Sequence, residues 1–241
     1  MTVLLKLENV SKFYGALKAV DNVTVAVDTG EALGVIGPNG AGKTTLFNLI
    51  SGDAAPTGGR IAFAGADVTA KRSHARCRLG MGRSYQIPHP FANMTVFENL
   101  LVGAIHGGRH TERESYWRCT EVLALTGLYD KANTRAGTLT LLQRKRLELA
   151  RALAMDPKLL LLDEIAGGLS EYECGELVKT IKDIHARGTT NVWIEHIVHA
   201  LLSVASRLIV MNFGQILAQG NPREVIADAR VREVYMGIPV S

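Results

Sequence analysis

One glycine-rich segment constrains the fold of this chain more than any other feature of its sequence. The segment matches the pattern G-x-x-x-x-G-K-[ST] and consists of Gly37, Pro38, Asn39, Gly40, Ala41, Gly42, Lys43 and Thr44. An apolar run, Ala32–Ile36, comes directly before it, and a helical pattern with Leu46, Leu49 and Ile50 on one face follows it. A buried strand, a glycine-rich turn and a helix in this order form a phosphate-binding loop. The segment therefore predicts an α/β fold that binds a phosphorylated ligand.

A nucleoside triphosphate needs many hydrogen-bond donors close together, because its phosphates carry several negative charges. Glycines let backbone N–H groups converge on the phosphates without a Cβ in the way, and the start of the following helix adds partial positive charge. The Lys43 ammonium can reach the β- and γ-phosphates, and the Thr44 hydroxyl can ligate Mg²⁺. The loop therefore predicts a nucleoside triphosphate, with Mg²⁺, as the ligand.

Two neighbouring carboxylates follow a second strongly apolar segment. Four consecutive leucines at positions 159–162 predict a buried strand, and Asp163 and Glu164 come directly after it. In sheets of this class ligands bind at the carboxyl ends of the strands, where Asp163 would hold Mg²⁺ directly or through water. Glu164 would accept a proton from the attacking water, which is the work of a general base.

The pattern of apolar residues changes twice along the chain. Residues 1–35 are typical of strands, residues 95–153 are mostly helical, and the last third alternates between strands and helices. Thr95 and Ser170 are each followed three residues later by glutamate, which predicts capping boxes at two helix starts. Strands that alternate with helices indicate a parallel sheet covered on both faces.

These patterns predict an α/β fold with a P-loop NTPase core, a mostly parallel sheet, an N-terminal antiparallel β part and an inserted helical subdomain. The nucleotide-binding core is assigned to residues 1–86 and 156–241. The helical subdomain is assigned to residues 87–155, with helices expected over 96–105, 112–125 and 141–155.

The composition excludes several classes of protein. Among the 241 residues, 47% are hydrophobic and 21% are charged, which is the balance of a folded globular domain. No run approaches the ~18 apolar residues of a membrane span, and the start shows no signal peptide. The net charge is +4, and we expect the basic segments 72–83 and 144–146 to be solvated faces. The three cysteines are far apart, so neither a disulfide framework nor a zinc site is predicted, and a reducing cytosol is expected.

The motifs, taken in order, resemble those of ABC-type ATPase subunits over nearly the whole chain. Gln86 follows the strand-like residues 81–85, LTLLQRKRLELARAL occupies 139–153, LLLLDE occupies 159–164 and WIEH occupies 193–196. With the GPNGAGKTT loop, their order and spacing are similar to the Walker A, Q-loop, signature, Walker B and switch-histidine motifs of that family. Three segments look most similar to ATP-binding subunits of branched-chain amino acid importers: GPNGAGKTTLFNLISG, FANMTVFENLLVGA and REVYMG.

The resemblance implies how nucleotide and metal are bound. Tyr14, just before Gly15, would stack on adenine, although an ordinary strand-edge aromatic is the alternative. The phosphates would lie on the loop from Gly37 to Thr45. Mg²⁺ would be held by Thr44, Gln86 and Asp163.

The resemblance also implies catalytic roles for Lys43, Gln86, Glu164 and His196. His196 would contact the γ-phosphate and help to position the attacking water. Gln86 would sense a transmembrane partner, and the loop 87–94 would help to form the groove for that partner's coupling helix. For this loop, local packing is the alternative interpretation.

The signature segment departs from the family pattern LSGGQ. Leu139 is followed by Thr140, Leu141, Leu142 and Gln143, so a hydroxyl and the glutamine are kept but both glycines are leucines. In the family this segment closes over the γ-phosphate of ATP bound to the opposite subunit. Leucine keeps the backbone N–H but hinders close approach and any geometry with positive φ. We therefore expect a weakened contact with the opposite ATP.

The resemblance finally implies an ATP-hydrolysing importer subunit for branched-chain amino acids or related small organic solutes. Two cassettes, identical or sisters, would sandwich two ATP molecules and drive two transmembrane permease subunits, with a solute-binding protein engaged indirectly. The chain would lie peripherally on the cytoplasmic face of the bacterial inner membrane and bind no nucleic acid. Alternatives are a weakly active regulatory subunit with a degenerate signature, or an ABC ATPase that acts on nucleic acid or ribosomes.

Overall fold

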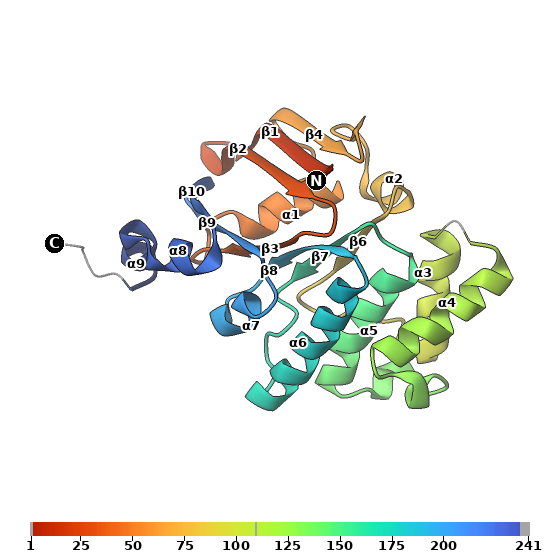
Figure 1. Cartoon of the computed structure of the whole chain (residues 1–241). Coiled ribbons are helices and arrows are strands. Elements are labelled where there is room, and N and C mark those ends of the chain that lie inside the picture. Colours follow the sequence, from red (N-terminus) through yellow and green to blue (C-terminus); the bar gives the residue numbers. More distant parts are fainter. Residues whose placement is uncertain (1, 109, 237–241) are drawn as a thin grey trace. The chain divides into compact units, whose positions relative to one another are not determined.

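The computed structural model describes residues 2–108 and 110–236, so Gly237 of the REVYMG segment lies outside the described residues. The chain forms two compact units. The first comprises residues 1–73 and 190–241, and the second comprises residues 74–189. The predicted helical subdomain, 87–155, falls inside the second unit (Figure 1).

An antiparallel sheet forms one layer of the first unit. Its strands, in the order β2-β1-β4-β5, are β2 (Leu17–Asp28), β1 (Val3–Tyr14), β4 (Gly58–Phe63) and β5 (Ala66–Asp67). Alternating residues of β2, such as Val23, Val25 and Val27, are buried, because successive side chains of a strand point to opposite faces. This sheet is the predicted N-terminal antiparallel part.

A mostly parallel group of strands forms the rest of that unit's sheet structure. The order is β10-β9-β3-β8, with β3 (Ala32–Ile36) parallel to both β8 (Thr190–Ile194) and β9 (Arg207–Asn212), and β10 (Gln215–Gly220) antiparallel to β9. All residues of β3 and β8 are buried, as expected for strands covered on both faces. The carboxyl ends of β3 and β8 therefore lie side by side, where the phosphate-binding loop and the WIEH segment leave the sheet.

The described residues of the first unit form four helices: α1 (Lys43–Ser51), α7 (Val198–Leu202), α8 (Pro222–Ala227) and α9 (Ala229–Met236). Helix α7 is short and ends at Leu202. The Ser203 hydroxyl donates to the Ala200 carbonyl at 2.7 Å, and the Ser206 N–H donates to the Ala32 carbonyl at 2.8 Å. These bonds turn the chain out of the helix and into β9.

The described residues of the second unit form two parallel strands and five helices, and the last four of these helices in chain order lie side by side in Figure 1. The strands are β6 (Met81–Ser84) and β7 (Leu159–Asp163), and the helices are α2 (Ser73–Arg78), α3 (Val96–His106), α4 (Glu112–Leu125), α5 (Leu141–Ala154) and α6 (Glu171–Ala186). Two short 3-10 turns, Tyr129–Lys131 and Ala136–Thr138, connect α4 to α5. In the described part of the chain, no helix combines the length and the apolar character that a bilayer crossing requires.

Four helices of this unit begin with a complete capping box. The boxes pair Thr95 with Glu98, Thr111 with Glu114, Thr140 with Gln143, and Ser170 with Glu173. The first and last confirm the two predicted from the sequence. Each satisfies backbone N–H groups at a helix start that would otherwise have no partner within the helix, and so fixes where the helix begins.

Candidate nucleotide site

The phosphate-binding loop has the backbone geometry that its glycines predict. All nine predicted residues, Gly37 to Thr45, lie in the loop after β3 and in the first turn of α1. Gly40 and Gly42 take φ of +79° and +99°, where a side chain would be strained. A Cβ at Gly42 would overlap the Ala19 carbonyl oxygen, whereas one at Gly40 would project into open space. The loop therefore has room for a phosphate beside Gly40 and close packing beneath Gly42.

The start of α1 presents the expected donors. Helix α1 begins at Gly42 without a side-chain cap, so its first-turn N–H groups can serve an anion. The Lys43 ammonium is 7% exposed and donates to the carbonyls of Gly37 (2.7 Å) and Pro38 (3.1 Å). Thr44 is exposed, as a hydroxyl that ligates a metal must be. These groups fit a nucleoside triphosphate.

Tyr14 lies at the tip of the hairpin between β1 and β2. It pairs with Leu17 across the turn, in which Gly15 takes φ of +60°. The ring is 51% exposed, and the Lys12 ammonium lies 5.1 Å from its centroid. An exposed aromatic face of this kind can stack on a base.

His196 leaves the sheet at the end of β8, next to the strand that carries the phosphate-binding loop. Its side chain is 59% exposed, and its Nδ1 lies 3.2 Å from Oε1 of Glu195, a fully buried carboxylate. The same oxygen accepts the His196 backbone N–H at 3.1 Å. Glu195 therefore orients the imidazole, a role that the sequence analysis did not assign to it.

Tyr235 of α9 also reaches the phosphate-binding loop. A backbone hydrogen bond from Gly37 to the phenolic oxygen lowers the pKa of Tyr235. Partial burial of this residue, which is 42% exposed, has the larger effect and raises that pKa to about 12. The phenol is therefore neutral at physiological pH. The REVYMG segment that marked the resemblance thus contributes a contact at the loop.

In the second unit, the carboxylate predicted to hold Mg²⁺ forms a buried ion pair. Asp163 ends β7, and its Oδ2 lies 2.8 Å from Nη2 of Arg83 on the neighbouring strand β6. Both side chains are less than a tenth exposed, at 6% and 7%. Removing one member of such a pair leaves an uncompensated buried charge, which typically costs about 3–5 kcal/mol.

Glu164 is held by the predicted Q-loop residue. Gln86 Nε2 donates to Glu164 Oε2 at 2.6 Å, so the structure brings these two predicted site residues together. The backbone of Glu164 takes φ of +43°, a conformation that residues other than glycine adopt only at a cost in strain. The carboxylate is thus fixed by a side-chain contact and presented from a strained backbone.

The prediction that residues 72–83 and 144–146 form solvated faces is wrong for three of their basic residues. Arg76 and Lys145 are 1% and 3% exposed, and the Arg83 side chain is 7% exposed. Arg83 is buried because Asp163 compensates its charge. The Lys145 ammonium can be buried because it donates hydrogen bonds to two backbone carbonyls, that of Gln86 at 2.5 Å and that of Glu164 at 3.5 Å. A count of basic residues in the sequence does not show such partners.

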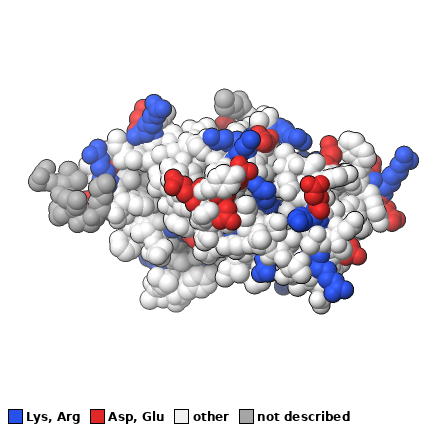
Figure 2. Space-filling view, turned by 90° about the horizontal axis from the view of Figure 1, so that it is seen from below, with Lys and Arg blue, Asp and Glu red and all other residues white. Residues whose placement is uncertain are grey.

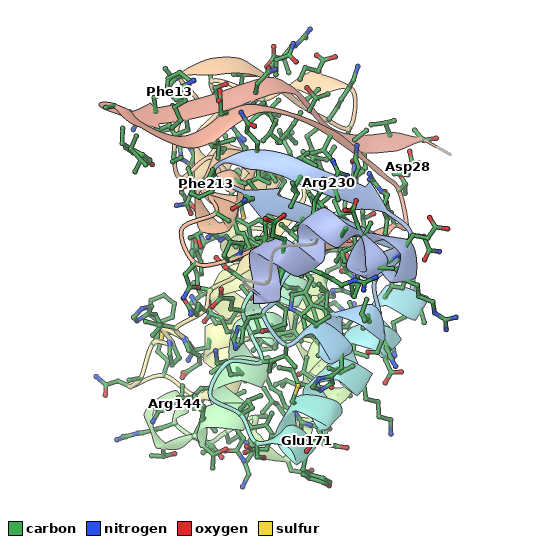
Figure 3. All side chains as sticks on the ribbon, turned by 90° about the vertical axis from the view of Figure 1, so that its left-hand side faces the viewer. Phe13, Asp28, Arg144, Glu171, Phe213 and Arg230 are labelled. Atoms are coloured by element: carbon green, nitrogen blue, oxygen red, sulfur yellow. The ribbon has the colours of Figure 1, made fainter. Side chains whose placement is uncertain are left out.

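The signature segment forms the start of a regular helix. Thr140 caps α5, its hydroxyl accepts the Gln143 N–H at 3.4 Å, and Gln143 Oε1 accepts the Thr140 N–H at 3.0 Å. Leu141 and Leu142 are the first two helical residues, and neither takes a positive φ. Arg144, labelled in Figure 3, donates to the Leu139 carbonyl at 2.9 Å and fixes the preceding turn. Leucine in place of the two glycines therefore changes the side-chain bulk of the segment and not its backbone conformation. The Leu141 side chain is in a position to obstruct a ligand, because this residue is 44% exposed.

Comparison with known proteins identifies the family of this chain. The model of a family described as ABC transporter matches residues 20–167. The chain belongs to the ABC transporter family. This ABC cassette is 34% identical to the probable branched-chain amino acid transport ATP-binding protein LivG of Methanocaldococcus jannaschii, over 97% of each chain. It is 35% identical to the lipopolysaccharide export system ATP-binding protein LptB of Acidithiobacillus ferridurans, over 98% of each.

Solved structures of ABC cassettes have the same fold. The ADP conformation of MJ1267, an ATP-binding cassette of an ABC transporter, is 33% identical and superposes with a TM-score of 0.90 over 99% of this cassette and all of that chain. A dimeric structure of the cassette MJ0796, bound to ADP and Pi, is 26% identical with a TM-score of 0.81 over 91% of this cassette and 99% of that chain. The ABC cassette is accordingly an ATPase subunit whose ATP hydrolysis is coupled to transport.

Proposed function

We propose that the site hydrolyses ATP with Glu164 as general base. The observation that carries this proposal is the buried strand β7, which presents Asp163 and Glu164 in sequence, with Gln86 bonded to the Glu164 carboxylate. Lys43 and the loop N–H groups neutralise phosphate charge, which is the main requirement of phosphoryl transfer. His196, oriented by Glu195, positions the attacking water.

Mg²⁺ would be held by the Thr44 hydroxyl, the Gln86 amide and the Asp163 carboxylate. These are oxygen donors of the kind that Mg²⁺ prefers. The ion supplies charge neutralisation on the phosphates. The residues themselves keep the oxygens in place: Arg83 fixes one oxygen of Asp163, and Glu164 accepts the Gln86 N–H so that the amide oxygen can face the ion.

Glu164→Gln tests the general-base assignment. The amide cannot accept the proton of the attacking water but has nearly the same shape. We expect kcat to fall by about 10²–10⁴-fold, while ATP binds with unchanged affinity. Steady-state hydrolysis and equilibrium binding of a fluorescent ATP analogue measure the two effects. Unchanged turnover would refute the assignment.

We also propose that the transported solutes are branched-chain amino acids or related small organic molecules, taken up with two permease subunits and, indirectly, a solute-binding protein. The near-complete alignment with a relative named for branched-chain amino acid transport supports this. The loop 87–94 would receive the permease's coupling helix. Ile87 and Phe91 are exposed there, at 65% and 44%, and Asn99 fixes the backbone of Phe91 with bonds of 2.9 and 3.1 Å.

Uptake measurements test the solute. Deletion of the gene in its host is expected to abolish high-affinity uptake of labelled leucine, isoleucine and valine. The wild-type gene should restore uptake and the Glu164→Gln variant should not. Normal amino acid uptake combined with a defect in lipopolysaccharide delivery would instead favour the activity named for the exporter relative.

A weakly active regulatory subunit is the second candidate function. It is favoured by the exposed leucine at the start of the signature helix, since Leu141 stands where the family has glycine. In that case this cassette's own phosphate-binding loop is competent, while the signature that it offers to a partner is impaired.

On the face shown in Figure 2, acidic and basic residues are interspersed, and that face offers no continuous basic surface for nucleic acid.

A further inference from the structure

A buried lysine connects three catalytic elements of the second unit. Helix α5 carries the signature at its start and Lys145 one turn later, on its buried side. The Lys145 ammonium donates to the Gln86 carbonyl at 2.5 Å and lies 3.5 Å from the Glu164 carbonyl. Gln86 in turn donates its side-chain amide to the Glu164 carboxylate at 2.6 Å. The signature helix, the Q-loop and the general base thus form one closed network.

The Glu164 backbone needs this support. A positive φ of 43° at a residue other than glycine is strained and persists only where its surroundings enforce it. The Glu164 carbonyl accepts the Gly167 N–H at 3.3 Å, in the turn that follows β7. The ammonium of Lys145 is the second donor near that same carbonyl. A charge-assisted hydrogen bond is roughly twice as strong as a neutral one, so it is suited to hold a strained carbonyl.

We propose that Lys145 is a positioning residue, which holds Glu164 in its reactive backbone conformation and ties it to the Q-loop and to the signature helix. The inference rests on the proposed function of Glu164. Lys145 itself does no chemistry. Its charge is fully enclosed, with 3% exposure, and it acts through the backbone carbonyls of Gln86 and Glu164. When α5 moves, Lys145 moves the general base with it.

The role predicts a separation of kinetic effects. Lys145→Met keeps most of the length of the side chain but removes the donors, so the carbonyls of Glu164 and Gln86 lose their bonds to the ammonium. We expect kcat to fall at least about tenfold, which corresponds to ~1.4 kcal/mol of transition-state stabilisation. KM for ATP should change less than about twofold, because Lys145 acts through the backbone carbonyls of Gln86 and Glu164 and not on the phosphates. Lys145→Arg keeps the charge and the donors and should recover most of the turnover.

Arg146→Met is the matched control. Arg146 is the next residue of the same helix, and its guanidinium pairs with Glu176 of α6 at 3.5 Å, away from the network. Arg146→Met removes a largely buried guanidinium from α5, as Lys145→Met removes a buried ammonium, and should keep kcat within about twofold of the wild type. A loss of turnover in Arg146→Met equal to that in Lys145→Met would show a general effect of disturbing α5 and would overturn the proposal.

A double variant separates this inference from the proposed function. If Lys145 acts through Glu164, adding Lys145→Met to Glu164→Gln should lower the residual turnover by less than twofold, because residues that act as a unit are not additive. Independent, additive losses would overturn the positioning role. If Glu164→Gln itself retains turnover, the proposed function fails first. If Lys145→Met does not fold, Lys145→Gln and Lys145→Arg are measured in the same backgrounds with the same criteria.

Discussion

At the scale of single residues, burial gives Glu148 a measurable dependence on pH. This carboxyl on α5 is 6% exposed. Burial raises its pKa above the ordinary value of 4.5, against the opposing effects of Arg151 and of the His89 backbone N–H. The folded state therefore holds the proton more tightly than the unfolded state. The free energy of unfolding contributed by Glu148 falls as pH rises from about 4.5 through the folded pKa.

Glu148→Gln removes this ionisation while keeping an oxygen for the His89 N–H. We expect wild type to lose stability relative to this variant as pH rises through that window, and the difference to be level at higher pH. Urea unfolding of both proteins at a series of pH values measures it. A difference that grows in the opposite direction, or that does not depend on pH, would contradict the raised pKa.

The residues proposed to perform chemistry could be selected from the sequence, whereas the residues that hold them in place could not. Gln86, Asp163 and Glu164 could be assigned because each stands in a motif of fixed spacing. Arg83 and Lys145 stand in basic segments that also suit a solvated surface. Only the fold shows that a carboxylate or a carbonyl oxygen meets each of them.

At the scale of elements, the turn between β9 and β10 stores strain that can be removed. Asn212 pairs with Gln215, so Phe213 and Gly214 form a two-residue turn with φ of +45° and +78°. Such a turn favours Asn-Gly. Phe213, labelled in Figure 3, is 85% exposed, so it gains little from packing that could offset the strained backbone.

Phe213→Asn should therefore stabilise the protein by about 1 kcal/mol, because asparagine tolerates this conformation and phenylalanine does not. The midpoint of chemical unfolding measures the gain. Phe213→Ala is the control, since alanine keeps the strain and removes only the ring, and it should change stability by less than about 0.5 kcal/mol. An equal gain from alanine would assign the effect to the exposed ring instead.

Elements with strong boundary signals were predicted best. Helix α4 has the expected bounds, Glu112–Leu125, and it starts with a complete capping box. The two-residue strand β5 and the six-residue helix α2 were not predicted. Elements this short contain fewer than two repeats of a helical or strand pattern, which is too few to recognise in the sequence. Their formation depends on packing against the rest of the unit.

At the scale of the whole molecule, the two leucines of the signature decide whether two copies of this chain can form a working ATP site. Because Leu141 and Leu142 begin a regular helix without positive φ, only their side-chain bulk can hinder approach to the ATP of an opposite subunit. Alanine at both positions should then relieve the hindrance as well as glycine does. Turnover of the chain alone should rise with the square of protein concentration at low concentration, since two copies form each site.

We expect the Leu141→Ala, Leu142→Ala double variant to raise this turnover about tenfold at a given concentration, a gain of ~1.4 kcal/mol, with ATP affinity of the isolated chain unchanged. Steady-state hydrolysis across a dilution series measures both the order in concentration and the gain. Rescue by glycine but not by alanine would assign the effect to backbone geometry. Turnover strictly proportional to concentration would contradict the dimeric site, because a monomer would then suffice.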